Sequence, residues 1–286
     1  MKILSIGNSF SMDAQRWLYT IAASDGVTDL DSVNLYRGGC NLRRHCENIL
    51  GNVPDYMYQH NGENTDRMIT IDEALTEEKW DFITIQQVSR MSGMPQHFVP
   101  YINILADYVK EKQPDAALVF HQTWAYEWGS EAGSYEFYNS DQEEMYRRIV
   151  DCAEMACILT GAEYLPCGEF IQHLRRTVKE FDYRGGGLSL CHDDGFHLSK
   201  NYGRYAAGVF WYHYFTGRFH ENTAGFAEKN RDGDYTFDPA VLDSIVGALK
   251  VFVEERKDWE YVMDLPPFAA AYRDGKKASE IFSKNF

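Results

Sequence analysis

Two short polar segments, far apart in the chain, contain residue types that can carry out acyl transfer. Ser9 lies in Gly7-Asn8-Ser9-Phe10-Ser11, and Asp194 precedes His197 by three residues in the segment 191–199. A histidine can take the proton of a serine hydroxyl that attacks a carbonyl carbon, and a carboxylate can hold that histidine in the required tautomer. Ser9, His197 and Asp194 are therefore the candidate nucleophile, base and orienting acid.

Each segment also has a simpler interpretation. Ser9 could be a helix N-cap, although Ser11 or Asp13 could fill that position equally well. Asp194 could accept hydrogen bonds from backbone N–H groups in a polar loop. Four residues have the types of zinc ligands, but their spacing matches no zinc pattern and we predict no metal site from Cys191, His192, Asp194 and His197.

The order of predicted elements places Ser9 at one edge of a sheet. Short apolar runs alternate with segments of helical periodicity, which is typical of an α/β fold with a parallel sheet. We predict strands at 3–6, 32–36, 82–85, 117–120 and 164–165. Ligands bind at the carboxyl ends of strands in such sheets. Ser9 follows the first strand and polar or glycine residues follow the next three, so we expect a site at this edge.

Helices are predicted where apolar residues recur at steps of three and four. One follows the first strand, and others cover 139–160, Lys200 to about Phe215 with Ser199 as N-cap, and 238 to about 256. We expect one domain over residues 1–286. In it, residues from about 217 to 286 form a C-terminal helix and an irregular tail packed on the rest.

The two end segments together resemble the SGNH (GDSL-like) hydrolases. That family has Gly-Asp/Asn-Ser after its first strand and Asp-x-x-His near its C-terminus, matched here by Gly7-Asn8-Ser9 and by Asp194-Gly195-Phe196-His197. The resemblance covers about residues 1–215. It implies a flavodoxin-like three-layer α/β/α fold with a five-stranded parallel sheet of order 2-1-3-4-5. It also implies a Ser9 nucleophile, a His197 base and Asp194 as its orienting acid.

The resemblance further implies an oxyanion hole, in which this sequence departs from the family. The backbone N–H of Ser9 and that of a glycine after the second strand, here Gly39, are the expected donors. The family's third donor is an asparagine side chain after the third strand. Gln86 and Gln87 occupy that place here, and the amide of one of them could reach the oxyanion. Because neighbouring strand residues point to opposite faces, only one can serve, and we place Gln86 first.

Aromatic residues gather after the fourth predicted strand. Trp124 and Tyr126 are candidate substrate-binding residues because sugar rings stack well on such side chains. The alternative is that these rings pack in the core or form a lid, which is the more common use of a buried aromatic side chain.

Composition excludes several classes of partner. Asp and Glu number 43 against 28 Lys and Arg, giving a formal net charge of −15. Such a surface repels nucleic acid and anionic membranes. No apolar run is long enough to cross a bilayer. Without an apolar leader after Met1, the chain as it stands is expected to be cytoplasmic, or secreted or periplasmic if a signal peptide has been removed.

The sequence and the resemblance together predict a cofactor-independent serine esterase. Its expected substrates are small acyl esters, including acetyl groups on carbohydrates. The alternative is a flavodoxin-like protein that binds a carbohydrate or nucleotide at the same strand ends without chemistry.

Overall fold

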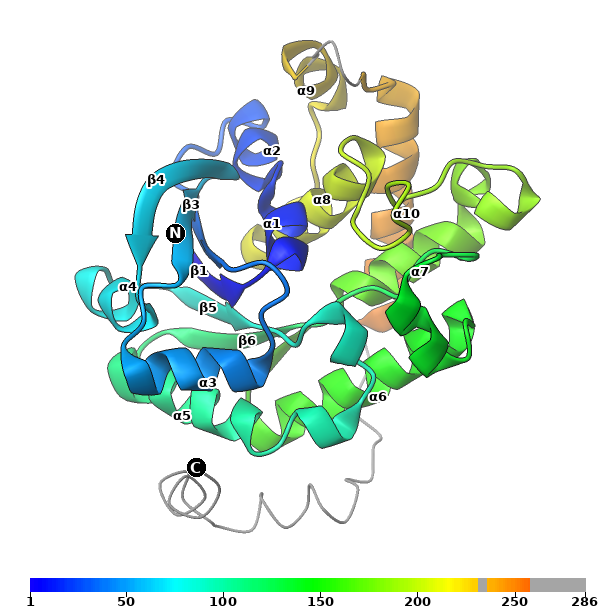
Figure 1. Ribbon diagram of the computed structural model, residues 1–286. Helices are drawn as coiled ribbons and strands as arrows, with labels where there is room; N and C mark the ends of the chain where they lie inside the picture. Colours follow the sequence, from blue (N-terminus) through cyan, green and yellow to red (C-terminus); the bar gives the residue numbers. More distant parts are fainter. Residues whose placement is uncertain (231–235, 258–286) are drawn as a thin grey trace.

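A seven-stranded sheet forms the middle layer of the molecule (Figure 1). The computed structural model describes residues 1–230 and 236–257. The strand order across the sheet is β4-β3-β2-β1-β5-β6-β7. The strands are β1 (Lys2–Gly7), β2 (Asp31–Tyr36), β3 (Tyr56–His60), β4 (Glu63–Ile69), β5 (Phe82–Ile85), β6 (Ala117–His121) and β7 (Glu163–Leu165).

The prediction of a purely parallel, five-stranded sheet is wrong. The five predicted strands pair in parallel as β2-β1-β5-β6-β7. However, β3 and β4 form an antiparallel hairpin that extends the sheet beyond β2, so the order of the whole sheet differs from 2-1-3-4-5. Asn61 and Gly62 make its turn with φ of 49° and 81°. Both are positive, as a two-residue hairpin turn of matching twist requires.

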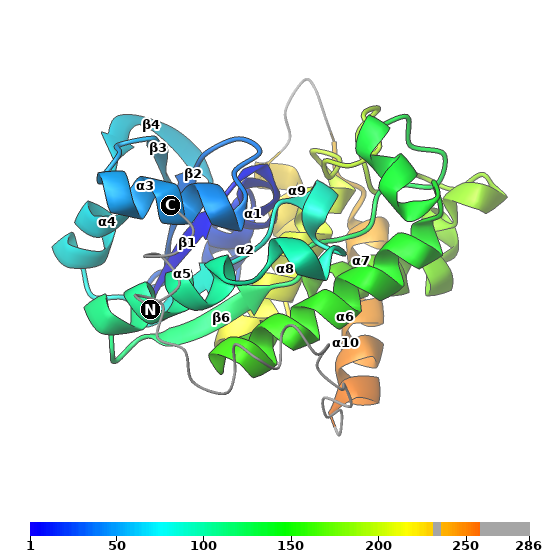
Figure 2. The ribbon, with the colours of Figure 1, turned by 60° about the horizontal axis from the view of Figure 1, so that its bottom comes forward.

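Helices cover both faces of the sheet (Figures 1 and 2). Because alternate strand residues point to opposite faces, each face has its own core: Ile3 lies in one and Leu4 in the other. The core around Leu4 receives α3 (Leu42–Gly51), α4 (Ile71–Glu77), α5 (Tyr101–Lys112) and much of α6 (Gln142–Thr160). The core around Ile3 receives α1 (Ser9–Gln15), α2 (Leu18–Ser24), α7 (Cys167–Thr177), α8 (Tyr202–Thr216), α9 (Thr223–Lys229) and α10 (Pro239–Arg256).

The helix predicted after the first strand is divided into α1 and α2. Its apolar residues Ala14, Leu18, Ile21 and Ala22 are buried, but the helix breaks at Arg16 and Trp17. The hairpin turn packs on this break so closely that a Cβ on Gly62 would lie 2.6 Å from the Arg16 carbonyl oxygen. Gly62 is therefore required both by its backbone conformation and by this contact.

The C-terminal helix begins where its sequence predicts. Asp238 is the N-cap of α10, its side chain accepts from the Ala240 N–H, and Pro239 occupies the first turn. The helix packs on α7, α8 and α9. The tail predicted after it falls on residues 258–286, which lie outside the described residues. Across residues 1–230 and 236–257, no helix combines the length and apolarity needed to span a membrane.

Candidate active site

The turn between β1 and α1 presents the Ser9 hydroxyl at the carboxyl edge of the sheet. Asn8, not Ser9, is the N-cap: its side-chain oxygen accepts from the Phe10 N–H at 2.9 Å. The Ser11 hydroxyl accepts from the Asn8 N–H at 3.0 Å and completes a capping box. These two residues satisfy the start of the helix, so the hydroxyl of Ser9 is available for a partner elsewhere.

That partner is His197. The Oγ of Ser9 lies 2.8 Å from Nε2 of His197, and Nδ1 of His197 lies 2.7 Å from Oδ2 of Asp194. Oδ1 of Asp194 accepts from the N–H groups of Phe196 and His197, each at 3.0 Å. The structure thus joins the three residues in one hydrogen-bonded chain, although 188 positions separate Ser9 from His197.

The hydrogen bonds of Asp194 favour its ionised form. Partial burial opposes the charge, but the two backbone N–H groups and the His197 ring outweigh it, and the pKa of Asp194 lies below its ordinary value. An ionised Asp194 accepts a hydrogen bond from the Nδ1–H group of His197. Nε2 is then the nitrogen that can accept the proton of Ser9.

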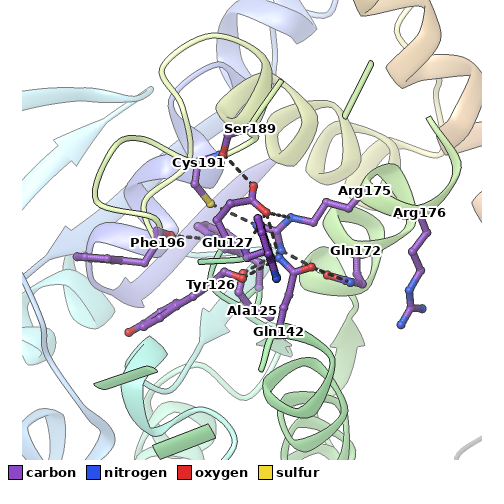
Figure 3. A network of polar contacts seen from close by, with 12 residues as sticks. Ala125, Tyr126, Glu127, Gln142, Gln172, Arg175, Arg176, Ser189, Cys191 and Phe196 are labelled. Carbon is purple, nitrogen blue, oxygen red and sulfur yellow. Dashed lines mark hydrogen bonds and ion pairs between the residues drawn. The ribbon is translucent and has the colours of Figure 1, made fainter. Parts of the chain in front are cut away.

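A buried carboxylate supports the loop that carries Asp194 and His197 (Figure 3). Glu127 accepts from the Ser189 hydroxyl at 2.8 Å and from the Gln142 amide at 3.0 Å. Its backbone N–H donates to the Gly195 carbonyl at 2.7 Å. Arg175 lies 3.5 Å away and both side chains are only 5% exposed. Burial opposes the charge of Glu127, but Arg175 and these hydrogen bonds lower its pKa.

Further hydrogen bonds from Arg175 and Trp124 support the loop that carries Asp194 and His197. Arg175 donates to the Ala125 carbonyl at 2.9 Å and to the Cys191 sulfur at 3.3 Å. The indole N–H of Trp124 donates to the Phe196 carbonyl at 2.8 Å. Cys191 is therefore buried and engaged within this network (Figure 3). Among the residues that the structure describes, no cluster of three or more His, Cys, Asp and Glu could hold a metal ion.

Asp13 ties the nucleophile's helix to the same loop. It lies one turn after Ser9 on α1 and is completely buried. Its Oδ2 accepts from the Leu198 N–H at 2.8 Å, and its Oδ1 lies 2.9 Å from Nε of Arg204. Burial raises the pKa of Asp13 to about 6, although the charges of Arg204 and His197 act in the opposite direction.

Asp13 is expected to contribute a loss of stability as the pH rises from about 4 to about 6. The pKa of Asp13 is about 6 in the folded protein against an ordinary value of 3.8, so in this range the folded state holds a proton that the unfolded state has lost. Measured relative to Asp13→Asn protein, the free energy of unfolding should fall by up to about 3 kcal/mol across the range. Urea unfolding at closely spaced pH values measures this decline.

Asp13→Asn cannot ionise, so its stability should lack that decline. Asp29→Asn is the matched control, because Asp29 is exposed, and its curve should run parallel to that of the wild type. Parallel curves for wild type and Asp13→Asn would contradict the assignment.

Gly39 lies beside the nucleophile's turn. The Asn8 side-chain amide donates to the Cys40 carbonyl at 3.0 Å, which fastens the Gly38-Gly39-Cys40 turn to the start of α1. Gly39 is exposed and has φ of 64°. The role of its backbone N–H as an oxyanion donor stays a prediction.

The two glutamines are engaged by protein groups. The Gln86 amide donates to Oδ1 of Asn8 at 2.8 Å, and its oxygen lies 2.7 Å from Nδ1 of His121. Burial lowers the pKa of His121 to about 3, so its ring is neutral and Nδ1 donates. The Gln87 amide donates to the His97 carbonyl at 2.9 Å. Gln86 therefore holds the N-cap residue Asn8 in place, and a role for either amide in the oxyanion hole stays a prediction.

Trp124 and Tyr126 lie in the core, so neither ring is placed to stack on a sugar. They are 0% and 3% exposed. Trp124 stacks on Phe10 with ring centroids 4.3 Å apart, and the Tyr126 hydroxyl lies 3.1 Å from that of Ser89. Core packing, the alternative interpretation of these aromatic residues, is what the structure shows.

Sequence reasoning missed Asp13, Glu127 and Arg175. Charged residues are usually exposed, and no local pattern separates a buried ion pair from a surface one. For Asp13 a signal exists: it follows Ser9 by four residues, which places it on the same face of the helix. Glu127 and Arg175 offer no comparable signal.

Comparison with known proteins identifies the family. A DUF4886 family protein from Bacteroides uniformis is 32% identical, covers 93% of this chain and 99% of its own, and superposes with a TM-score of 0.76. A candidate SGNH hydrolase from Slackia heliotrinireducens shares the fold at 20% identity, with a TM-score of 0.51 over 74% of this chain and 97% of its own.

An acetyl xylan esterase, AlAXEase, matches with a TM-score of 0.47 at 9% identity, over 74% of this chain and 98% of its own. No curated protein matches. The family described as "Domain of unknown function (DUF4886)" matches residues 2–229. The chain therefore belongs to the DUF4886 family.

Proposed function

We propose that the protein is a serine esterase that hydrolyses small acyl esters through an acyl-enzyme. The observation that carries this proposal is the continuous chain from Ser9 through His197 to Asp194, with distances of 2.8 and 2.7 Å. A nucleophile, a base and an orienting acid at such distances constitute the arrangement of a serine hydrolase.

In the first half of the reaction, Nε2 of His197 takes the proton of Ser9 as Oγ bonds to the ester carbonyl carbon. The negative charge that develops on the carbonyl oxygen is stabilised by the backbone N–H groups of Ser9 and Gly39. Asp194 stabilises the imidazolium. When the tetrahedral intermediate collapses, the C–O bond to the alcohol breaks and His197 gives its proton to the departing alcohol oxygen.

In the second half, water replaces the alcohol. His197 takes a proton from the water as its oxygen bonds to the acyl carbon. The bond from that carbon to Ser9 then breaks, and the proton passes from His197 to Oγ of Ser9. A carboxylic acid leaves and the enzyme is restored, so the cycle requires no cofactor.

The surroundings of Ser9 favour a small acyl group on a polar alcohol. The ring of Phe10 lies beside that of His197, and Trp124 stacks on Phe10. These two rings are 1% and 0% exposed. A long acyl chain would have to displace these rings. By contrast, the side chains of His197 and Asp194 are 28% and 37% exposed, so a bulky, hydrated alcohol such as a sugar can approach from solvent. Acetylated carbohydrates are the proposed substrate class.

Labelling with a fluorophosphonate tests the proposal, because this probe reacts with an activated serine. Peptide mass spectrometry should find one adduct, on Ser9, and the protein should release acetate from acetylated mono- and oligosaccharides faster than it releases fatty acids from long-chain esters. A folded protein that takes no adduct and releases no acetate would instead be a non-catalytic binding protein.

A further inference from the structure

Arg90 lies after β5 and close to Gly39, and hydrogen bonds hold its backbone. It belongs to the short 3₁₀ helix η1 (Ser89–Met91), which follows the carboxyl end of β5. The Tyr138 hydroxyl donates to the Arg90 carbonyl at 3.1 Å, and the Met91 N–H donates to the Val88 carbonyl at 2.9 Å. The start of the Arg90 side chain is therefore fixed at the same sheet edge as Ser9.

The guanidinium group of Arg90 reaches Gly39. A Cβ placed on Gly39 would lie 3.6 Å from Nη1 of Arg90. Gly39 in turn is fastened to the nucleophile's turn through the hydrogen bond from Asn8 to the Cys40 carbonyl. The positive charge thus lies on the side of Ser9 where the ester carbonyl oxygen is expected.

No acidic side chain of residues 1–230 and 236–257 forms an ion pair with Arg90 at 4.0 Å or less. Most arginines in this part of the chain do form one; examples are Arg16 with Glu63, Arg37 with Asp55 and Arg67 with Glu77. Acidic residues are abundant, since Asp and Glu number 43 against 28 Lys and Arg. A part-buried arginine beside Gly39 is thus left with its donors available to a ligand.

We propose that Arg90 binds a carboxylate of the substrate, so that the preferred esters are those of acidic alcohols, such as sugars that carry a carboxylate. This inference rests on the proposed esterase function. The planar guanidinium matches a carboxylate through two parallel hydrogen bonds. The anion belongs to the alcohol part, because the rings packed beside His197 favour a small acyl group.

A role for Arg90 as a third oxyanion donor is less well supported. Oxyanion donors are preorganised, as the backbone N–H groups of Ser9 and Gly39 are. No hydrogen bond to a described residue fixes the guanidinium of Arg90. A guanidinium that is free to turn suits a ligand with two oxygens, because two hydrogen bonds to that ligand set its orientation.

Two matched acetyl esters test the proposal: 3-acetoxybenzoate, which carries a carboxylate, and its uncharged methyl ester. The wild type should prefer the carboxylate by about 10- to 100-fold in kcat/KM, mainly through KM, because the contact exists before the transition state. Arg90→Met should lose the preference and Arg90→Lys should keep part of it. Arg218→Met is the control, since Arg218 is exposed, forms no ion pair with a described residue and follows α8.

The outcomes separate this inference from the proposed function. A wild type without the preference, an Arg90→Met variant that keeps it, or an equal loss on both esters would overturn the role of Arg90 while leaving the esterase intact. If the wild type hydrolyses neither ester, calorimetric titration of Ser9→Ala protein decides. Binding of 3-acetoxybenzoate that Arg90→Met abolishes would support the anion site without the esterase, and absence of such binding would overturn both.

Discussion

Ser9→Ala protein is expected to lose ester-hydrolysing turnover by about 10⁴-fold or more, because it lacks the hydroxyl that is hydrogen-bonded to Nε2 of His197. The substitution should leave the fold intact. The helix start is satisfied by Asn8 and Ser11, so removing the Ser9 hydroxyl costs one part-buried hydrogen bond to His197. Its effect on the free energy of unfolding should stay within about 1 kcal/mol. Steady-state hydrolysis of an acetyl ester and urea unfolding measure the two quantities.

A second substitution checks that the loss is catalytic. Ser9→Ala combined with His197→Ala should be nearly as active as Ser9→Ala alone, because the two residues act as a unit. Ser244→Ala, at a part-buried position on α10 whose hydroxyl donates to the Ala240 carbonyl, should retain wild-type turnover. If the Ser9→Ala variant retained most of its activity while folded, another group would have to be the nucleophile.

The central part of the fold could be predicted because its signal is local. Apolar runs bounded by turns located the five parallel strands, and helical periodicity with an N-cap located α10. The β3–β4 hairpin was missed because β4 is largely exposed and has no apolar face. Asn61-Gly62 was the available signal, since this pair favours the turn that joins two hairpin strands. A search for apolar runs alone does not find an exposed edge strand.

The candidate site could be predicted only as far as its motifs extend. Ser9, Asp194 and His197 stand in short segments whose order along the chain matches a known arrangement, and the structure brings them together. The contacts of Gln86 and Gln87 could not be predicted for a different reason. Whether an amide faces a substrate or a protein group depends on residues distant in sequence, such as Asn8 and His121 for Gln86.

The buried pair of Glu127 and Arg175 could not be predicted for the same reason. Glu127 and Arg175 are 48 positions apart and each is an ordinary charged residue in its own segment, yet they pair in the interior. A buried pair of this kind holds a loop in one arrangement because an unpaired charge would cost several kcal/mol. In this protein that loop carries Asp194 and His197. Polar contacts between residues distant in sequence therefore hold these two side chains in position.

Asp194→Asn protein is expected to lose about 10²- to 10⁴-fold in kcat, although asparagine is nearly the same size. The amide oxygen can replace Oδ1 and accept from the N–H groups of Phe196 and His197. The amide NH₂ would then face Nδ1 of His197, where Oδ2 now accepts. A donor in that position stabilises the tautomer with its proton on Nε2, and this tautomer cannot take the proton of Ser9.

Two control variants test whether the loss comes from the carboxylate of Asp194. Asp193→Asn removes the neighbouring exposed carboxylate and should leave turnover near that of the wild type. Asp194→Ala leaves Nδ1 of His197 without either an acceptor or a donor, so it should retain at least as much activity as Asp194→Asn. If Asp194→Asn reduced kcat by less than about tenfold, a different carboxylate would have to orient His197. Asp13 would then be the first residue to test, because its charge already acts on that ring.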